Sequence, residues 1–425
     1  MTTHLKYASL ALAVGLFGCS EQPISSANKP SAENHEAVNI ANVRSHIKTL
    51  ASDEFLGRGP LTEGETLTIN YLADEYKKLG LSGSFNGEFL QPVTMAKLTP
   101  DQNMTLKVGD LSFNAGSDFT ARTQQINPEI NIDGSDVVFV GYGINAPEYN
   151  WDDFADIDVK DKTIIVLVND PGFATQDDAL FTGNAMTYYG RWTYKYEEGA
   201  RQGAKAVFIV HETAPAAYPW GVVESSNTGS KYTLIDQDKN ASDIPVMGWI
   251  DEQAANEIFA QAGLDYQTEK ANALKADFKP VDLKAKAALT LKSDISQAQS
   301  HNVVATLRGS ETPDEYIVIG AHWDHFGTKQ TDEGVKIYNG AVDNASGSAA
   351  TVEIARILTE MHKKKPFKRS IIFANFTAEE TGLIGSEQFA TGEIVPTKQM
   401  VALLNIDGMN VLDLVDYIST HGKAM

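Results

Sequence analysis

The sequence predicts an α/β protein with a doubly wound, mostly parallel sheet and a small β-rich domain inserted into it. From residue 300 onward, near-continuous apolar runs alternate with an amphipathic helical pattern, as expected for strands that are covered on both faces. Between residues 105 and 290, shorter apolar runs are separated by Gly- and Asp-rich turns, which is typical of a separate β-rich core. The length of 425 residues leaves room for two or three domains.

The individual elements follow from the spacing of apolar residues. Residues 64–80 have apolar side chains at helical spacing and end at Gly80, which predicts an amphipathic helix. In the inserted region the expected strands are 137–140, 164–168, 206–210 and 244–249, with a helix at 195–202. In the main sheet the expected strands are 303–307, 316–321, 371–376 and 401–406, with a helix at 346–361. Strand–helix–strand order implies parallel neighbours.

The charge of the chain excludes nucleic acid as a main partner. Lys and Arg total 35 against 56 Asp and Glu, which gives a formal net charge of −21. Phosphate backbones attract the opposite sign. The sequence leaves the oligomeric state open.

The first residues predict export and a lipid anchor. An apolar run at 8–17 is too short for a permanent membrane span and ends in small residues, as a signal peptide does. Cys19, the single cysteine, follows Leu16-Phe17-Gly18, a run that resembles a bacterial lipobox. We therefore expect a signal peptide at 1–18, lipidation at Cys19 and a flexible tether at 19–35. Ser20 resembles the residue found in lipoproteins sorted to the outer membrane. An ordinary cleaved signal with an incidental cysteine is the alternative.

Acidic side chains and a histidine follow the ends of the expected strands of the main sheet. His322 follows the strand at 316–321, the pair Glu379-Glu380 follows 371–376, and Asp407 follows 401–406. Asp343 lies in a Gly-rich loop before the expected helix at 346–361. Ligands of open parallel sheets bind outside the carboxyl ends of the strands, so we expect these side chains to converge.

Such a cluster indicates a metal site. One histidine and several carboxylates cannot all stay charged and unpaired in a crevice, and a divalent metal resolves the repulsion. Nitrogen and oxygen ligands without sulfur suit zinc, and the number of carboxylates suits a two-metal site with one bridging carboxylate. Asp324 is placed to orient the His322 imidazole. One member of the Glu379-Glu380 pair can ligate while the other acts as general base. Each residue alone also suits a turn or a helix cap; it is their joint occurrence that favours metal.

Four motifs resemble the M28 family of zinc exopeptidases: GAHWDH at 320–325, GAVDNASGSAATVEIAR at 340–356, FANFTAEETGLIGSEQFA at 373–390 and NID at 405–407. Residues 46–81 are similar to the N-terminal helical segment of that family. The stretch 105–290, with VVFVGYGI and GAKAVFIV, resembles a protease-associated (PA) domain. The resemblance implies peptidase parts at 36–104 and 291–425 around a PA-like domain at 105–290.

The resemblance also implies roles for single residues. His322 and Asp407 correspond to ligands of one zinc, Asp343 to the bridging carboxylate and Glu380 to a ligand of the second zinc. Glu379 corresponds to the general base, and Asp324 to the acid that supports the histidine. The bond between Asp343 and Asn344 corresponds to a cis peptide of the family.

One ligand of the family has no clear counterpart. The family supplies a further histidine for the second zinc, well downstream of the Asp407 position. Only His421 follows Asp407, in a stretch that suits a strand and its turn, and His325 lies too close to His322 along the chain to serve. We therefore expect the chain to be a piece of a longer protein, in which two zinc ions are bound.

The function expected is that of a di-zinc aminopeptidase acting on peptides in the bacterial cell envelope, with membrane contact through the lipid alone. A carboxypeptidase or a glutaminyl cyclase on the same fold is an alternative. A second alternative is an envelope lipoprotein that binds peptides without cleaving them.

Overall fold

The computed structural model describes residues 38–409, which belong to one compact unit. The helices are α1 (Ile40–Leu50), α2 (Glu63–Lys78), α3 (Pro171–Thr175), α4 (Trp192–Arg201), α5 (Thr213–Ala216), α6 (Trp220–Asn227), α7 (Glu252–Gln261), α8 (Tyr266–Asn272), α9 (Ser346–Lys364) and α10 (Ile384–Ala390). Two shorter helical turns bear on the site, the 3-10 turn η1 (Asp53–Arg58) and the π-turn η4 (Ala341–Ala345). Cys19 and His421 lie outside the described residues.

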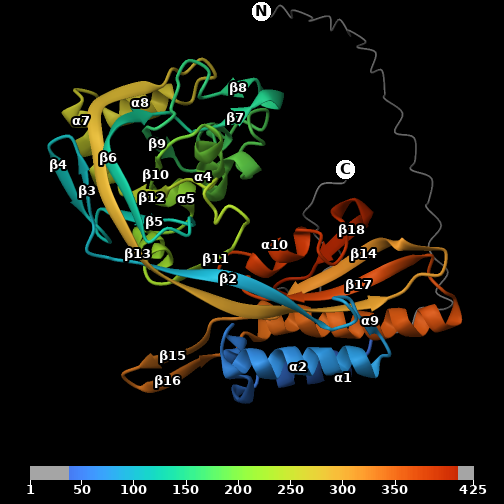
Figure 1. The fold of residues 1–425 in the computed structure, drawn as a ribbon. Coiled ribbons are helices and arrows are strands. Elements are labelled where there is room, and N and C mark those ends of the chain that lie inside the picture. Colours follow the sequence, from blue (N-terminus) through green and yellow to red (C-terminus); the bar gives the residue numbers. More distant parts are fainter. Residues whose placement is uncertain (1–37, 410–425) are drawn as a thin grey trace, which may run out of the picture. The chain divides into compact units, whose positions relative to one another are not determined.

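Figure 1 shows the strands together with these helices. They are β1 (Ser82–Gly83), β2 (Leu90–Pro100), β3 (Thr105–Val108), β4 (Leu111–Asn114), β5 (Phe119–Arg122), β6 (Glu129–Phe139), β7 (Asn145–Ala146), β8 (Trp151–Asp152), β9 (Thr163–Leu167), β10 (Ala206–Val210), β11 (Lys231–Leu234), β12 (Val246–Ile250), β13 (Val281–Leu307), β14 (Thr312–His322), β15 (Gly327–Thr331), β16 (Gly334–Tyr338), β17 (Arg369–Phe376) and β18 (Met400–Asn405). All four strands expected in the main sheet and the helix expected at 346–361 are confirmed.

Helix α2 confirms the helix predicted at 64–80. The Thr62 hydroxyl caps its start by accepting from the backbone N–H of Gly64. Gly80, with φ of 77°, follows its last turn, where the left-handed conformation favours glycine. Its buried face includes Leu72 and Tyr76 and packs on the main sheet.

The main sheet has the order β18-β14-β17-β13. β14 pairs in parallel with both β17 and β18, with His322 opposite Phe376. Side chains from α1, α2 and α9 share a core with one face of this sheet, and α10 contributes Phe389 to the core on the opposite face (Figure 1). Helices on both faces and parallel neighbours confirm the predicted α/β class.

β13 departs from the parallel pattern. It runs antiparallel to β17, which lies between β13 and β14 in the sheet. Only the turn 308–311 joins β13 to β14, and so short a connection reverses the chain. The sheet is therefore mostly parallel, as predicted, with β14, β17 and β18 parallel and β13 antiparallel.

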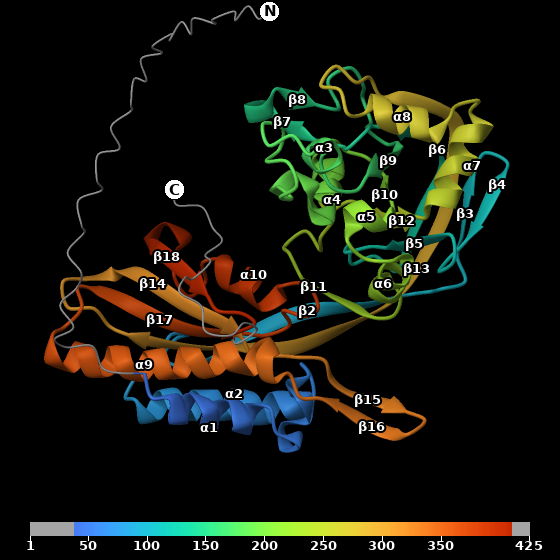
Figure 2. The same ribbon diagram turned by 180° about the vertical axis from the view of Figure 1, so that it is seen from behind.

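Residues of the inserted region form most of two hydrophobic clusters. β6, β9, β10 and β12 follow one another in parallel, and β5 closes the edge antiparallel to β12. Neighbouring residues of β10 belong to two clusters: Phe208 lies in one with side chains of α7 and α8, and Val207 lies in the other with side chains of α4 and α6. Figure 2 shows these helices around the strand. Helices on both faces make this region a mixed α/β unit rather than a β-only one.

Strand β13 belongs to both parts of the fold. Its first half pairs with β6 and β3, and its second half pairs with β2 and β17. The domain boundary predicted at residue 290 falls inside this strand. Among residues 38–409, no helix has the length and apolarity needed to cross a bilayer.

Candidate metal centre

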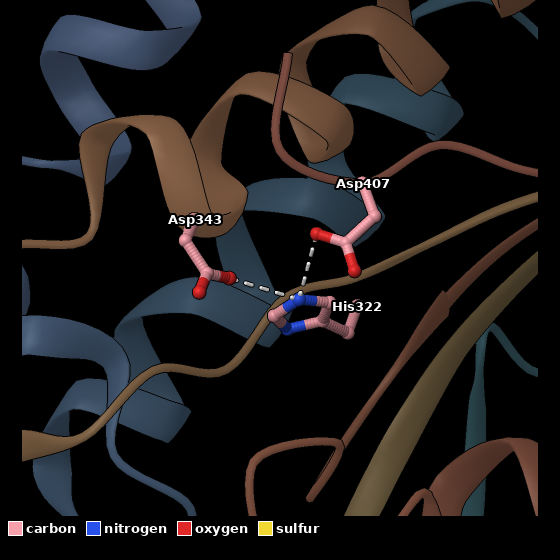
Figure 3. A group of neighbouring side chains, drawn as sticks. All are labelled: His322, Asp343 and Asp407. Carbon is pink, nitrogen blue, oxygen red and sulfur yellow. Dashed lines mark ion pairs between the residues drawn. The ribbon is translucent and has the colours of Figure 1, made fainter. Parts of the chain in front are cut away.

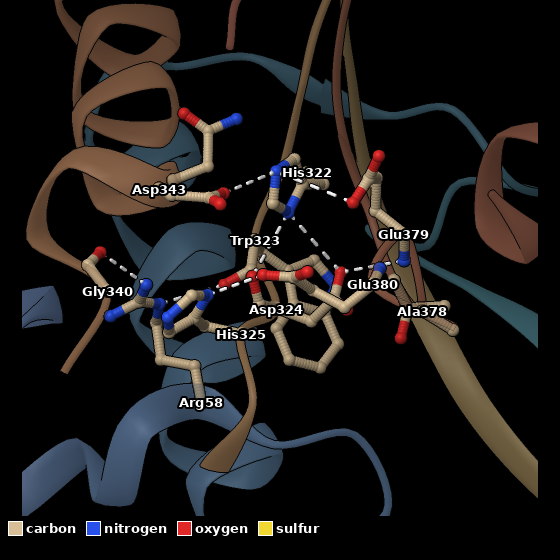
Figure 4. Close-up of polar contacts among 12 residues, drawn as sticks. Arg58, His322, Trp323, Asp324, His325, Gly340, Asp343, Ala378, Glu379 and Glu380 are labelled. Carbon is tan, nitrogen blue, oxygen red and sulfur yellow. Dashed lines mark hydrogen bonds and ion pairs between the residues drawn. The ribbon is translucent and has the colours of Figure 1, made fainter. Parts of the chain in front are cut away.

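The carboxyl ends of three parallel strands meet at one edge of the main sheet. β14 ends at His322, the chain beyond β17 carries Glu379 and Glu380, and the chain beyond β18 carries Asp407. Asp343 comes from η4, which leads into α9. The structure thus brings together all the residues that were predicted from the sequence as metal ligands or as the general base (Figures 3 and 4).

His322, Asp343 and Asp407 make up what we call the first ligand group (Figure 3). The His322 Nε2 lies 3.1 Å from Asp343 Oδ1 and 3.4 Å from Asp407 Oδ1. His322 is buried, whereas the two carboxylates are about half exposed, at 52% and 48%. The group therefore lies at the boundary between the core and solvent.

The His322 imidazole presents its Nε2 to this group. Its Nδ1 lies 3.1 Å from the backbone carbonyl of Asp324, which can only accept. In the neutral ring, the form that binds metal, Nδ1 therefore carries the proton and Nε2 is the free nitrogen. Nε2 is buried and has no hydrogen-bond partner, although carboxylate oxygens surround it. A buried nitrogen left without a hydrogen bond is costly, and a cation between it and the carboxylates would satisfy it.

Asp324 links two of the strand ends. Its carboxylate is fully buried, 3.7 Å from His322 Nδ1, and accepts from the backbone N–H groups of Glu379 at 3.1 Å and Glu380 at 3.4 Å. The same side chain thus supports the histidine and holds the turn that carries both glutamates. This placement fits the orienting role expected for Asp324.

His325, Asp343 and Glu380 make up the second ligand group. The His325 Nδ1 lies 2.5 Å from Glu380 Oε1 (Figure 4). We expected His325 to lie too close to His322 to take part. Instead the chain leaves the sheet after His322, and the turn brings the second ring to the glutamate. Asp343 is common to both groups, as a bridging carboxylate would be.

The turn that presents Asp343 is held to the other strand ends. The Asp343–Asn344 peptide is cis, as the resemblance implied. The Asn344 side chain donates to the Ile406 carbonyl at 3.0 Å and accepts from the N–H of Gly347 at 2.9 Å. A Cβ on Gly347 would lie 2.5 Å from the same Ile406 oxygen, so only glycine allows this approach. Asp343 and Asp407 are therefore fixed relative to each other through Asn344.

The charges of the cluster shift the pKa of two members in the metal-free protein. Burial lowers the pKa of His322, but the Asp324 carboxylate and the charges of Glu379 and Asp407 outweigh it and raise the pKa to about 9. Burial raises the pKa of Glu379 to about 6, with the His322 charge opposing the rise and the neighbouring carboxylates adding to it.

Zinc fits these residues. The donor atoms are one imidazole nitrogen and carboxylate oxygens in each group, a set that zinc accepts. The unpartnered Nε2 of His322 faces the two carboxylates of its group. Both ligand groups share Asp343, which matches the bridging arrangement of two-metal sites.

Comparison with known proteins places this cluster in a family. Residues 302–424 match the family model of peptidase family M28. A probable zinc metalloprotease of Pyrenophora teres f. teres is 40% identical over 109 residues, 25% of this chain and 22% of the relative. The aminopeptidase NAALADL1 of Mus musculus is 40% identical over 112 residues, 25% of this chain and 13% of the relative. A glutamate carboxypeptidase 2 homolog of Caenorhabditis elegans is 33% identical over 125 residues, 29% of this chain and 15% of the relative.

The matches cover less than a quarter of the length of these relatives. The matched family segment nevertheless includes His322, Asp343, Glu379, Glu380 and Asp407, all of the residues assigned as ligands or base. These residues converge at the carboxyl edge of the main sheet and lie in the part of the chain, residues 302–424, that is similar to peptidase family M28.

Proposed function

We propose that the protein is a zinc aminopeptidase that binds two metal ions. His322, Asp343 and Asp407 would hold one ion, and Asp343 and Glu380 would contribute to the other, with His325 beside them. Zinc supplies a Lewis acid and lowers the pKa of the attacking water. The proposal rests above all on the placement of Glu379, which stands next to the first ligand group without belonging to it.

Glu379 is placed to move the proton in peptide hydrolysis. Its Oε2 lies 3.9 Å from His322 Nε2, and its side chain is 30% exposed, so water and substrate can reach it. Burial raises the pKa of Glu379 in the metal-free protein, and a carboxylate placed in this way can take a proton from the attacking water and pass it to the leaving amine. The Asp324 carboxylate helps to position Glu379, because it accepts a hydrogen bond from the Glu379 backbone N–H.

One observation favours an aminopeptidase over a carboxypeptidase. Arg58, which lies beside the cluster, is buried and donates to backbone carbonyls, so it is not available to a substrate carboxylate. A carboxypeptidase remains the second candidate, because a relative with that name matches the same part of the chain.

Blocked peptides distinguish the candidates. With the full natural protein and saturating zinc, we expect cleavage of a peptide amide with a free amino terminus and no cleavage of an N-acetylated peptide with a free carboxylate. The opposite result would assign a carboxypeptidase, and cleavage of neither would favour the peptide-binding alternative.

The Glu379→Gln variant tests the role of the base. We expect it to lose hydrolysis and to retain zinc, because Glu379 lies outside both ligand groups. Glu360→Gln is the matched control: Glu360 is a surface residue of α9 paired with Lys363 and should leave turnover unchanged. Retained turnover in Glu379→Gln would remove Glu379 from the mechanism.

We also propose that the protein is an envelope lipoprotein anchored through Cys19. The lipobox-like run before Cys19 supports this localisation. Incorporation of labelled palmitate by the natural protein, absent in Cys19→Ser, is the expected result; equal labelling of both would rule out this anchor.

A further inference from the structure

Arg58 is a buried cation at the base of the candidate metal centre. It ends η1, has φ of 51°, and is 0% exposed. Its Nε donates to the Trp323 carbonyl at 2.9 Å, and its Nη2 donates to the Gly340 carbonyl at 2.7 Å (Figure 4). Its Nη1 donates to the carbonyls of Leu50 at 2.7 Å and Asn339 at 2.6 Å.

Three of the four acceptors of Arg58 belong to the two loops that carry His322 and Asp343; the fourth, the Leu50 carbonyl, ends α1. Trp323 stands between His322 and Asp324. Asn339 and Gly340 lead directly into the turn of Asp343. The guanidinium therefore connects the loop that carries His322 to the loop that carries Asp343 by hydrogen bonds. Because the guanidinium is planar and rigid, it sets the distance between these loops more firmly than a flexible lysine amine would.

Gly340 shows how closely the second loop approaches this side chain. A Cβ at this position would lie 2.6 Å from Arg58 Nη2 and 2.6 Å from the His325 ring. The backbone of Arg58 also takes part, because its carbonyl accepts from the N–H of His325 at 3.3 Å. Arg58 thus contacts residues next to both ligand groups.

The charge of Arg58 also suits this place. Its four hydrogen bonds go to carbonyls, so no carboxylate neutralises it by direct contact in these bonds. Burial lowers the pKa of Arg58 to about 10, and the charges of Asp324, Asp343 and Glu380 oppose that fall. The carboxylates of the centre are therefore the compensating charges of a buried guanidinium.

We propose that Arg58 is a positioning residue of the metal centre, which sets the separation of the His322 and Asp343 loops and thereby the affinity for zinc. This inference rests on the zinc site of the proposed function. Outer partners of metal ligands typically change metal affinity by about 10–100-fold when they are removed.

The chain offers a matched control in Lys195. This lysine is also buried, and its Nζ donates to the carbonyls of Tyr142 at 2.7 Å, Asn169 at 2.9 Å and Tyr189 at 2.8 Å. Its acceptors all belong to the inserted region. If Arg58 only supported the fold, Arg58→Met and Lys195→Met would act alike: both would lower stability and neither would change metal binding.

The experiment compares the full-length protein with Arg58→Met, Arg58→Lys and Lys195→Met, each stripped of metal by a chelator. Zinc affinity is measured by competition with a chelating dye, the visible spectrum is recorded with Co²⁺, and the unfolding midpoint is measured without metal. We expect Arg58→Met to bind zinc about 10–100-fold more weakly and to show an altered Co²⁺ spectrum. Arg58→Lys keeps the charge but not the fork, so it should recover part of the affinity.

Lys195→Met should unfold earlier and bind zinc as the unsubstituted protein does. If Arg58→Met had the same zinc affinity and the same Co²⁺ spectrum as the unsubstituted protein, the inference would be overturned. If that variant does not fold, Arg58→Lys decides: affinity equal to that of the unsubstituted protein overturns the inference, and weaker binding supports it. Failure of the unsubstituted protein to bind zinc would instead reject the proposed function.

Discussion

Two buried histidines follow apolar strands in different regions of this protein, and their surroundings differ. His211 follows β10 in the inserted region, 5% exposed, with its Nε2 2.9 Å from the Tyr218 carbonyl and its ring among Tyr218, Trp220 and Trp249. His322 ends β14 with its Nε2 unpartnered and facing carboxylates. Burial alone therefore does not identify a ligand; a buried nitrogen without a hydrogen bond, directed at acids, does.

The buried charges of the two regions differ in the same way. In the inserted region, Asp153 accepts from the Ile144 N–H and the Trp151 indole, and Lys195 donates to three carbonyls. At the sheet edge, the carboxylates of Asp343 and Asp407 gather around one imidazole. The buried charges of Asp153 and Lys195 are thus satisfied by hydrogen bonds within the inserted region, whereas the His322 Nε2 at the sheet edge has no such partner.

The largest expected effect comes from removing each histidine in turn. His322→Ala takes away the nitrogen of the first ligand group, so it should lose one bound zinc and all hydrolysis, a greater loss than the roughly 10–100-fold of an outer partner. His211→Ala should retain zinc, but its free energy of unfolding should fall by about 1–3 kcal/mol. The substitution leaves the Tyr218 carbonyl without its hydrogen bond and the space among the aromatic rings unfilled. Metal content by mass spectrometry and a denaturant titration measure both. If the two variants lost equal amounts of zinc, the distinction between His322 as a metal ligand and His211 as a structural residue would be wrong.

The second prediction concerns pH. In the metal-free protein the pKa of His322 is about 9, above its ordinary 6.5. A pKa raised by folding adds stability that is complete below pH 6.5 and is lost as the pH rises through 9. The shift corresponds to a loss on the order of 3 kcal/mol.

Denaturant titrations of chelated protein at pH 6.5 and pH 9 measure this loss. Saturating zinc should reduce the pH dependence, because the bound imidazole is neutral at both values. His322→Gln should reduce it too, whereas His211→Gln should leave it in place. Metal-free protein that is as stable at pH 9 as at pH 6.5 would contradict the charge assigned to His322.

Much of the fold and of the centre could be predicted from the sequence, because both depend on local patterns. Apolar runs locate the strands, and polar residues directly after them must gather at one sheet edge. His322, Glu380 and Asp407 were predicted in this way, and Asp343 was predicted from the Gly-rich loop before the helix at 346–361. The sequence predicts a mostly parallel sheet without saying which strand runs antiparallel, because the placement of β17 between β13 and β14 is set by tertiary packing and not by a local pattern.

The contributions of His325 and Arg58 could not be predicted from spacing. Which way the His325 ring points depends on the turn after His322, where helical and strand periodicities do not apply. Arg58 reaches the Trp323 carbonyl across 265 positions of sequence, and an arginine is ordinarily expected at the surface. Its one local signal is the run Gly57-Arg58-Gly59, in which Gly57 and Arg58 have positive φ.

The smallest expected effect compares two buried tyrosines. The Tyr76 hydroxyl donates to Asn375 Oδ1 at 2.6 Å, and Asn375 connects through Ser348 to the His322 carbonyl. The Tyr196 hydroxyl donates to the Gly248 carbonyl at 2.9 Å, within the inserted region. Tyr76→Phe and Tyr196→Phe should each lower the free energy of unfolding by about 1–2 kcal/mol, because each leaves a buried acceptor unpaired.

Zinc affinity separates these two tyrosines, since only the Tyr76 chain of hydrogen bonds ends at a metal ligand. Tyr76→Phe should weaken zinc binding by less than about tenfold, below the range of a direct outer partner, and Tyr196→Phe should leave it unchanged. Chelator competition on both variants measures the difference. If neither variant changes zinc affinity, the hydrogen bonds behind His322 serve the fold alone, and the region that positions the metal ends at the loops tied by Asp324 and Arg58.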